Sequence, residues 1–211
     1  MKLNKYIDHT LLKSIATERD IKNLCQEAIK YGFYSVCVNP CNVKQANNLL
    51  QGTDVKIASV VGFPLGANKT EIKVNEAIMA VEDGASEIDM VINIGKLKEG
   101  NYDYVINEIN QIRERSGVLT KVIIETSQLT KEEIVKMCEI VNLSKAECIK
   151  TSTGFVGEGA KLEDVKLMAS LMKQNKFVKA SGGIRDKETA LKMIETGAKR
   201  LGTSSGVKIV E

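Results

Sequence analysis

Short apolar runs rich in β-branched residues alternate along the chain with longer stretches whose apolar positions recur with helical period. The short runs predict eight strands, at residues 6–9, 35–39, 56–62, 87–94, 121–126, 147–151, 177–181 and 200–203. The longer stretches predict helices that begin near residues 17, 42, 70, 102, 130, 162 and 186. Thr130-Lys131-Glu132-Glu133 has the form of a capping box, and Pro40 stands just ahead of the second helix start. Strand and helix are therefore expected to alternate throughout.

The predicted strands are apolar on both faces, as in a parallel sheet that helices cover on both sides. Eight strand–helix units in 211 residues favour an α/β fold, a single (β/α)8 TIM barrel over residues 1–211. An open doubly wound sheet is the alternative. Its dinucleotide-binding turn is disfavoured because Pro64 interrupts the run Gly62-Phe63-Pro64-Leu65-Gly66, where that turn needs glycine.

Composition narrows the classes of partner and the compartment. The 30 basic and 27 acidic residues are interspersed, which argues against a nucleic-acid or membrane-surface protein. The sequence has neither a secretory signal pattern at its start nor an apolar run of membrane-spanning length, so we expect a cytoplasmic protein. Five cysteines without a C-x-x-C pair, and His9 as the single histidine, predict reduced thiols and no metal site.

Two lysines stand in apolar runs that end in small residues and glycine, Lys150 in residues 148–154 and Lys179 in residues 177–183. Burying an unpaired ammonium costs several kcal/mol, so the pair suggests amine chemistry. If both side chains point inward, burial and mutual repulsion favour a free amine on one of them, as Schiff-base formation requires. The alternative is that the lysines reach the barrel rim or pair with a carboxylate.

A carboxylate in a third apolar run completes the candidate chemistry. Asp89 lies in residues 87–93 and shares a strand face with Val91 and Asn93. An inward Asp89 could pair with a lysine and relay protons, or form a purely structural salt bridge. Asp8 could contribute in the same way from the first strand, or serve only as a loop or cap residue.

Glycine-bearing turns follow the last three predicted strands, at residues 152–154, 181–183 and 202–206. Barrels often bind phosphate at the loops after strands seven and eight, through backbone N–H groups and a helix N-terminus, although tight turns also need glycine for themselves. We expect Ser204 and Ser205 to open a final helix. The candidate phosphate-binding residues are Gly154, Gly182, Gly183, Gly202, Ser204 and Ser205.

The chain resembles the deoxyribose-phosphate aldolases in eight stretches, residues 6–13, 35–40, 61–68, 87–95, 121–126, 149–155, 178–185 and 202–206. The resemblance implies that Lys150 forms a Schiff base, with Asp89 and Lys179 as proton donor and acceptor. It also implies reversible cleavage of 2-deoxy-D-ribose 5-phosphate to acetaldehyde and D-glyceraldehyde 3-phosphate, without metal or organic cofactor. Thr10, Cys37 and Asp8 are candidate supporting residues, and a homodimer is expected by analogy.

The chain departs from the family pattern at Ser127-Gln128, where Cys-Leu is commoner, and at Lys161, where a threonine usually caps the next helix. It also ends without the tyrosine-ended tail of some relatives. Two alternatives remain open. One is another phosphate-binding barrel enzyme, either a different Schiff-base aldolase or a sugar-phosphate isomerase. The other is a non-catalytic barrel that binds phosphorylated sugars.

Overall fold

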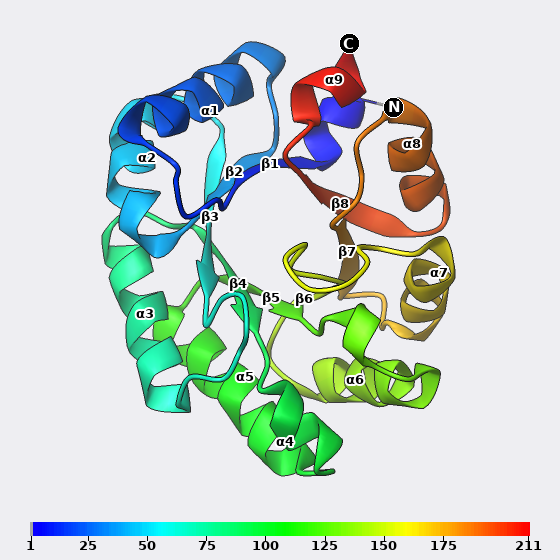
Figure 1. Cartoon of the computed structure of the whole chain (residues 1–211). Coiled ribbons are helices and arrows are strands. Elements are labelled where there is room, and N and C mark those ends of the chain that lie inside the picture. Colours follow the sequence, from blue (N-terminus) through cyan, green and yellow to red (C-terminus); the bar gives the residue numbers. More distant parts are fainter. Residues whose placement is uncertain (1) are drawn as a thin grey trace.

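The computed structural model describes residues 2–211 as a closed barrel of eight parallel strands in the order β1 to β8, with helices outside it (Figure 1). The strands are β1 (Ile7–Leu11), β2 (Ser35–Val38), β3 (Lys56–Val61), β4 (Glu87–Val91), β5 (Leu119–Ile123), β6 (Cys148–Lys150), β7 (Phe177–Ser181) and β8 (Ala198–Thr203). All eight predicted strands are present and they close on one another. The predicted (β/α)8 fold is confirmed, and the open doubly wound sheet is wrong.

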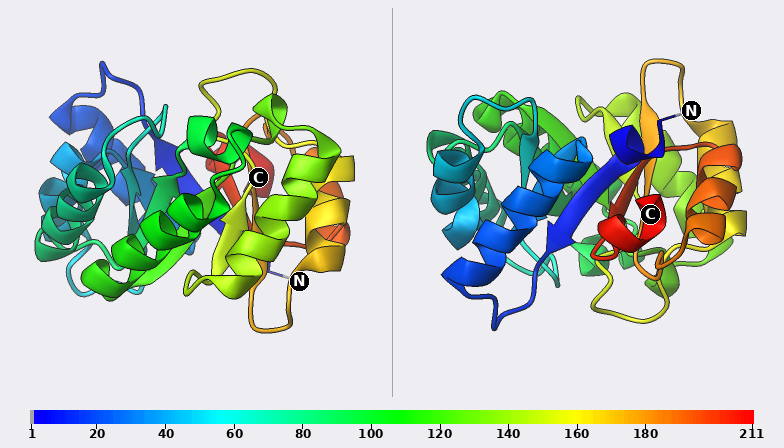
Figure 2. Two further views of the ribbon diagram at one scale, coloured as in Figure 1. Left: turned by 90° about the horizontal axis from the view of Figure 1, so that it is seen from below. Right: turned by 90° about the horizontal axis from the view of Figure 1, so that it is seen from above.

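Helices follow the strands and form the outer layer, which Figure 2 shows from two further directions. The helices are α1 (Glu18–Tyr31), α2 (Val43–Leu50), α3 (Thr70–Glu82), α4 (Ile94–Lys98), α5 (Tyr102–Ser116), α6 (Lys131–Leu143), α7 (Leu162–Leu171), α8 (Lys187–Glu195) and α9 (Gly206–Val210). All seven predicted helix starts are confirmed to within one residue. Within residues 2–211, none of these helices has the length and apolar character needed to cross a membrane.

Local hydrogen bonds explain where the helices begin. Thr130 and Glu133 form the predicted capping box at α6, with Glu133 N donating to Thr130 Oγ1 (3.2 Å) and Thr130 N donating to Glu133 Oε2 (2.8 Å). Ser205 directly precedes α9, as expected. At the start of α7, the side chain of Lys161 makes no cap hydrogen bond and pairs with Glu158 in an exposed ion pair (Nζ–Oε2 2.6 Å).

The predicted boundaries were wrong where a polar residue redirects the chain. The fourth strand ends at Val91 rather than continuing to residue 94, because Asn93 caps the short helix α4 by accepting a hydrogen bond from Lys96 N (3.1 Å). The fifth and eighth strands begin two residues before their predicted starts, at Leu119 and Ala198. Lys121 and Arg200, which stand at the predicted starts of these two strands, therefore lie within the strands, inside the barrel.

Strand register brings the candidate residues together. Asp89 on β4 is opposite Lys121 on β5, and Lys150 on β6 is opposite Lys179 on β7. The alternate residues of the same strands, including Ile88 and Ile149, are fully buried in the apolar core that also contains the inner faces of the helices. The apolar core thus lies outside the strands, and charged side chains fill the middle of the barrel.

Candidate active site

Asp89 is the shared partner of both lysines predicted from the sequence. Its Oδ2 accepts hydrogen bonds from Lys150 Nζ and from Lys179 Nζ, each at 2.7 Å. All three side chains are buried, Asp89 and Lys179 completely. Burial opposes ionisation of Asp89, but the ammonium groups of the surrounding lysines outweigh it and hold its pKa well below 3.8.

Lys179 lies deeper in the barrel between two carboxylates. Its Nζ pairs with Asp89 Oδ2 and also with Asp8 Oδ2. Burial alone lowers the pKa of an amine, but Asp8 and Asp89 outweigh this effect and raise the pKa of Lys179 above 10.5. Both lysines pair with Asp89, which is the carboxylate pairing that the sequence left open as an alternative. Asp8 is placed as a direct partner of the candidate site, and its alternative role as a loop or cap residue is wrong.

Sequence reasoning missed two further cations in the barrel, Lys121 and Arg200. Lys121 Nζ pairs with Glu87 Oε2 (2.6 Å) and with Asp89 Oδ1 (2.7 Å). Arg200 NH2 pairs with Glu87 Oε2 (2.7 Å) and with Asp8 Oδ1 (2.5 Å), and its guanidinium covers the ring of Tyr34 (3.5 Å to the centroid). Each cation is the first residue of its predicted strand, so the prediction gave no reason to place it inside the barrel.

The three lysines of this interior differ in their carboxylate partners. Within residues 2–211 the network joins the cationic Lys121, Lys150, Lys179 and Arg200 to the carboxylates of Asp8, Glu87 and Asp89. Four cations thus face three carboxylates. Arginine keeps its proton, and the pKa values of Lys121 and Lys179 are raised. Lys150 differs from them in its position, because its only carboxylate partner among residues 2–211 is Asp89 and it lines the cavity described next.

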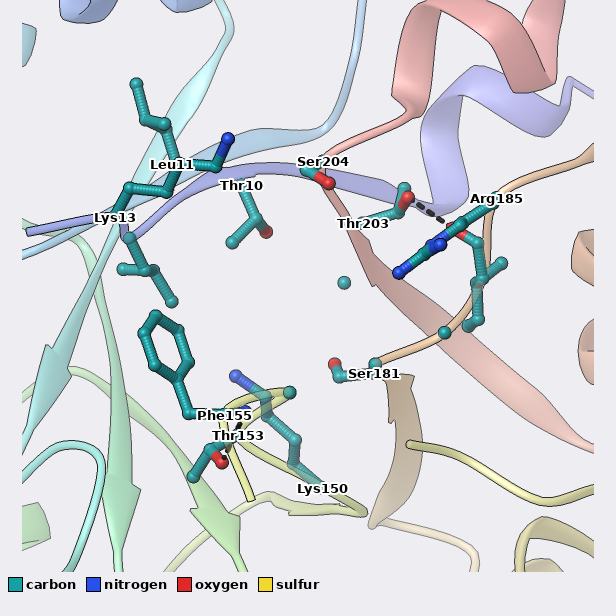
Figure 3. Close-up of a pocket in the computed structure, with 16 residues that line it drawn as sticks. Thr10, Leu11, Lys13, Lys150, Thr153, Phe155, Ser181, Arg185, Thr203 and Ser204 are labelled. Atoms are coloured by element: carbon teal, nitrogen blue, oxygen red, sulfur yellow. Dashed lines mark hydrogen bonds between the residues drawn. The ribbon is translucent and has the colours of Figure 1, made fainter. Parts of the chain in front are cut away.

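A cavity of about 320 Å³ opens above Lys150 at the C-terminal ends of the strands (Figure 3). Five of the six predicted phosphate-binding residues line it, together with Thr10: Gly154, Gly182, Gly183, Gly202 and Ser204. Ser205 is set behind this lining and donates its N–H to Thr203 Oγ1 (2.9 Å). Gly182 and Gly183 both have positive φ (87° and 77°), a conformation that suits glycine.

Cys37 lies in the wall of the barrel rather than in the cavity lining. It is fully buried in a small apolar cluster with Leu12, Ala58 and Val60. Its Sγ is 3.9 Å from Asp89 Oδ2, and burial together with that carboxylate raises the pKa of the thiol above 9.0. The structure thus agrees with the interpretation of Cys37 as a small packing residue.

Two kinds of side chain in the cavity had not been predicted. Arg185 lies two residues after the turn at Gly182 and Gly183. It points its guanidinium toward the cavity (Figure 3). Its position after a glycine turn was the signal that could have identified it, since arginine suits phosphate geometry. On the other side, Phe155 lines the cavity and packs edge-on against Phe63 (centroids 5.2 Å apart, 85°). Lys150 therefore lies between a polar side and an aromatic side.

The profile of the DeoC/LacD family aldolases matches residues 2–210. The chain belongs to this family. The deoxyribose-phosphate aldolase of Finegoldia magna is 58% identical over 212 residues, covering 100% of both chains, and that of Aciduliprofundum boonei is 57% identical over 212 residues, covering 99% of this chain and 96% of its own. Among solved structures, the deoxyribose phosphate aldolase from Aeropyrum pernix, described as a unique tetramer, is 35% identical with a TM-score of 0.90, covering 99% of this chain and 89% of its own.

Membership of this aldolase family agrees with what the interior offers chemically. A lysine amine hydrogen-bonded to a carboxylate, at the base of a cavity, is suited to imine formation with an aldehyde. Among residues 2–211, no group of three or more histidine, cysteine or acidic side chains could hold a metal ion.

Proposed function

We propose that this aldolase reversibly cleaves 2-deoxy-D-ribose 5-phosphate to acetaldehyde and D-glyceraldehyde 3-phosphate through a Schiff base on Lys150, as a single domain over residues 1–211. The observation that carries the proposal is the hydrogen bond from Lys150 to the Asp89 carboxylate that it shares with Lys179, beneath a cavity lined by glycine turns. The names of the relatives point to the same substrate. The reaction makes the chain a lyase of deoxynucleoside catabolism.

The reaction begins when the free amine of Lys150 attacks C1 of the open-chain sugar. The resulting carbinolamine loses water, with Asp89 and Lys179 carrying protons, and a protonated imine remains. The C2–C3 bond then breaks, and its electron pair moves into the imine to give an enamine. The C3 hydroxyl gives up its proton and becomes the aldehyde of glyceraldehyde 3-phosphate. Protonation of the enamine at C2, followed by addition of water, releases acetaldehyde and restores the amine.

The polar side of the cavity is the proposed phosphate site. The turn at Gly182 and Gly183 offers backbone N–H groups, Ser204 offers a hydroxyl, and Arg185 adds a positive charge. Gly154 lines the same cavity from the turn after β6. Binding the phosphate at this end would hold C1 against Lys150, so that interactions remote from the reacting carbons lower the barrier.

The proposed activity is tested by incubating the protein with 2-deoxy-D-ribose 5-phosphate and measuring acetaldehyde and glyceraldehyde 3-phosphate, with Lys150→Arg as the control. We expect equal amounts of the two products, and neither from the variant. A ketose phosphate without carbon–carbon cleavage would support the isomerase alternative. Saturable binding without turnover would support the non-catalytic barrel.

We further propose that the enzyme works in the cytoplasm on small phosphorylated sugars and aldehydes, with no nucleic-acid or membrane partner and no cofactor. The balanced overall charge of +3 supports this. We also propose self-association, a homodimer being the smallest form. Static light scattering after gel filtration decides this, and a mass of one 23.1 kDa chain would contradict it.

A further inference from the structure

Glu125 occupies a strained position at the end of β5. Its φ of 53° and ψ of 67° place it in the left-handed region, where it is the one non-glycine residue within residues 2–211. A side chain at such a position clashes with the backbone, whereas glycine adopts it freely. A buried glutamate that keeps this conformation therefore requires interactions that outweigh the strain.

The strain arises from an irregular pairing of β5 with β6. Ile124 N donates to Lys150 O (3.1 Å), and Thr126 N donates to Thr151 O (3.0 Å). The chain thus advances two residues on the β5 side but only one on the β6 side, as in a bulge. Glu125 is the extra residue, and the local turn directs its side chain toward the segment that follows Lys150.

The Glu125 carboxylate holds that segment through hydrogen bonds, which are called the clamp below. Its Oε2 accepts hydrogen bonds from both Thr153 N (3.1 Å) and Thr153 Oγ1, and its Oε1 accepts one from Ser127 Oγ (3.4 Å). Phe155 N in turn donates to Thr153 Oγ1 (3.1 Å). A continuous chain of hydrogen bonds therefore runs from Phe155 through Thr153 to Glu125.

This chain holds both neighbours of Gly154. Gly154 itself has a φ of 80° and lines the cavity. Gly182 of the second turn lies beside it, because a Cβ added at Gly154 would lie 3.6 Å from Gly182 Cα. The hydrogen bonds of Glu125 therefore hold the part of the turn after β6 that lies beside the turn after β7.

We propose that Glu125 is a positioning residue that holds the turn at Gly154 in the shape that receives the substrate phosphate. The inference rests on the proposed function, which it deepens. Glu125 acts through Thr153 rather than on the reacting carbons. Its expected influence is therefore on binding of the phosphate end, with Lys150 chemistry left intact.

Two substitutions at Glu125 separate this role from a purely structural one. Glu125→Gln keeps a carbonyl oxygen that can accept both hydrogen bonds from Thr153, so its KM should stay within about twofold of wild type. Glu125→Gly removes the clamp and the backbone strain together. Losing hydrogen bonds of ordinary strength should raise the KM for 2-deoxy-D-ribose 5-phosphate and weaken inorganic phosphate binding by roughly tenfold.

The matched control is Glu147→Gln, which alters another carboxylate that accepts a backbone hydrogen bond, from Thr120 N (2.9 Å), at the opposite end of the barrel. It should leave KM unchanged. Exchange of the methyl hydrogens of acetaldehyde, which needs Lys150 but no phosphate, should stay within about twofold of wild type in every Glu125 variant.

The proposal is overturned if Glu125→Gly leaves phosphate affinity unchanged, or if exchange falls as much as affinity does. If Glu125→Gly fails to fold, Thr153→Val, which cuts the same hydrogen-bond chain at Oγ1, must reproduce the rise in KM. Failure of the proposed function looks different. The wild type would then not cleave the sugar phosphate, while calorimetry with inorganic phosphate would still report on the clamp.

Discussion

Replacing Asp89 with asparagine removes the one charge that three lysines share. Lys121 contacts its Oδ1, and Lys150 and Lys179 contact its Oδ2, each at 2.7 Å. The substitution keeps the size of the side chain but leaves four cations facing two carboxylates in the barrel. An amide can accept a hydrogen bond, but it cannot offset the charge of an ammonium.

The size of the effect follows from burial. Asp89 is fully buried, and removing one partner from a buried ion pair typically costs about 3–5 kcal/mol. For a domain of this length we expect Asp89→Asn to lower the midpoint of thermal unfolding by roughly 10 °C. Loss of the proposed proton relay should lower kcat by about 10²–10⁴-fold.

The pH dependence of the unfolding free energy tests this reasoning more specifically than the thermal midpoint or kcat. The pKa of Asp89 lies well below 3.8 in the folded protein, so its stabilisation is present above the unfolded value and is lost as the pH falls toward the folded one. The difference in unfolding free energy between wild type and Asp89→Asn, measured with urea at a series of pH values, should be largest near neutral pH and shrink below about pH 4. Exposed Asp54 supplies the control, Asp54→Asn. A small difference that does not vary with pH would refute the reasoning.

Three further measurements follow from the site. Arg185→Gln should raise the KM for the sugar phosphate by roughly tenfold, while turnover of the unphosphorylated sugar stays unchanged; equal losses for both would remove Arg185 from the phosphate site. Prolonged dialysis against EDTA should leave kcat unchanged, since the proposed reaction uses only side chains, and loss of activity restored by a metal would contradict this. Thr130→Ala should lower the unfolding free energy by about 1 kcal/mol through loss of the α6 cap, which urea titration can detect.

Strand alternation in the sequence showed which residues share a face with each lysine, but it left open whether that face points into the barrel. Cys148 and Lys150 share one face of β6 and Ile149 belongs to the other, and both faces are buried in the structure. The same reasoning applied to Asp89. The convergence of these residues on one point depended on the closed barrel, which repeated strand–helix units predicted.

Features that depend on exact boundaries and on contacts across strands could not be read from the sequence. Lys121 and Arg200 stood at the first position of their predicted strands, whereas the strands begin two residues earlier, at Leu119 and Ala198. Glu125 appeared to be an ordinary strand residue in the run 121–126, and its left-handed conformation results from pairing with a segment more than 20 residues away. A single sequence shows neither the register between two strands nor which strand lies beside which.

The most direct test of the central claim is reductive trapping of the Schiff base. The protein is incubated with acetaldehyde and borohydride, and intact mass and peptide mapping then locate the modification in the wild type and in Lys150→Arg. We predict one ethyl group on Lys150 in the wild type and none at that site in the folded variant. An unmodified wild-type protein, or an ethyl group on Lys179 instead, would contradict the assignment of Lys150 as the nucleophile.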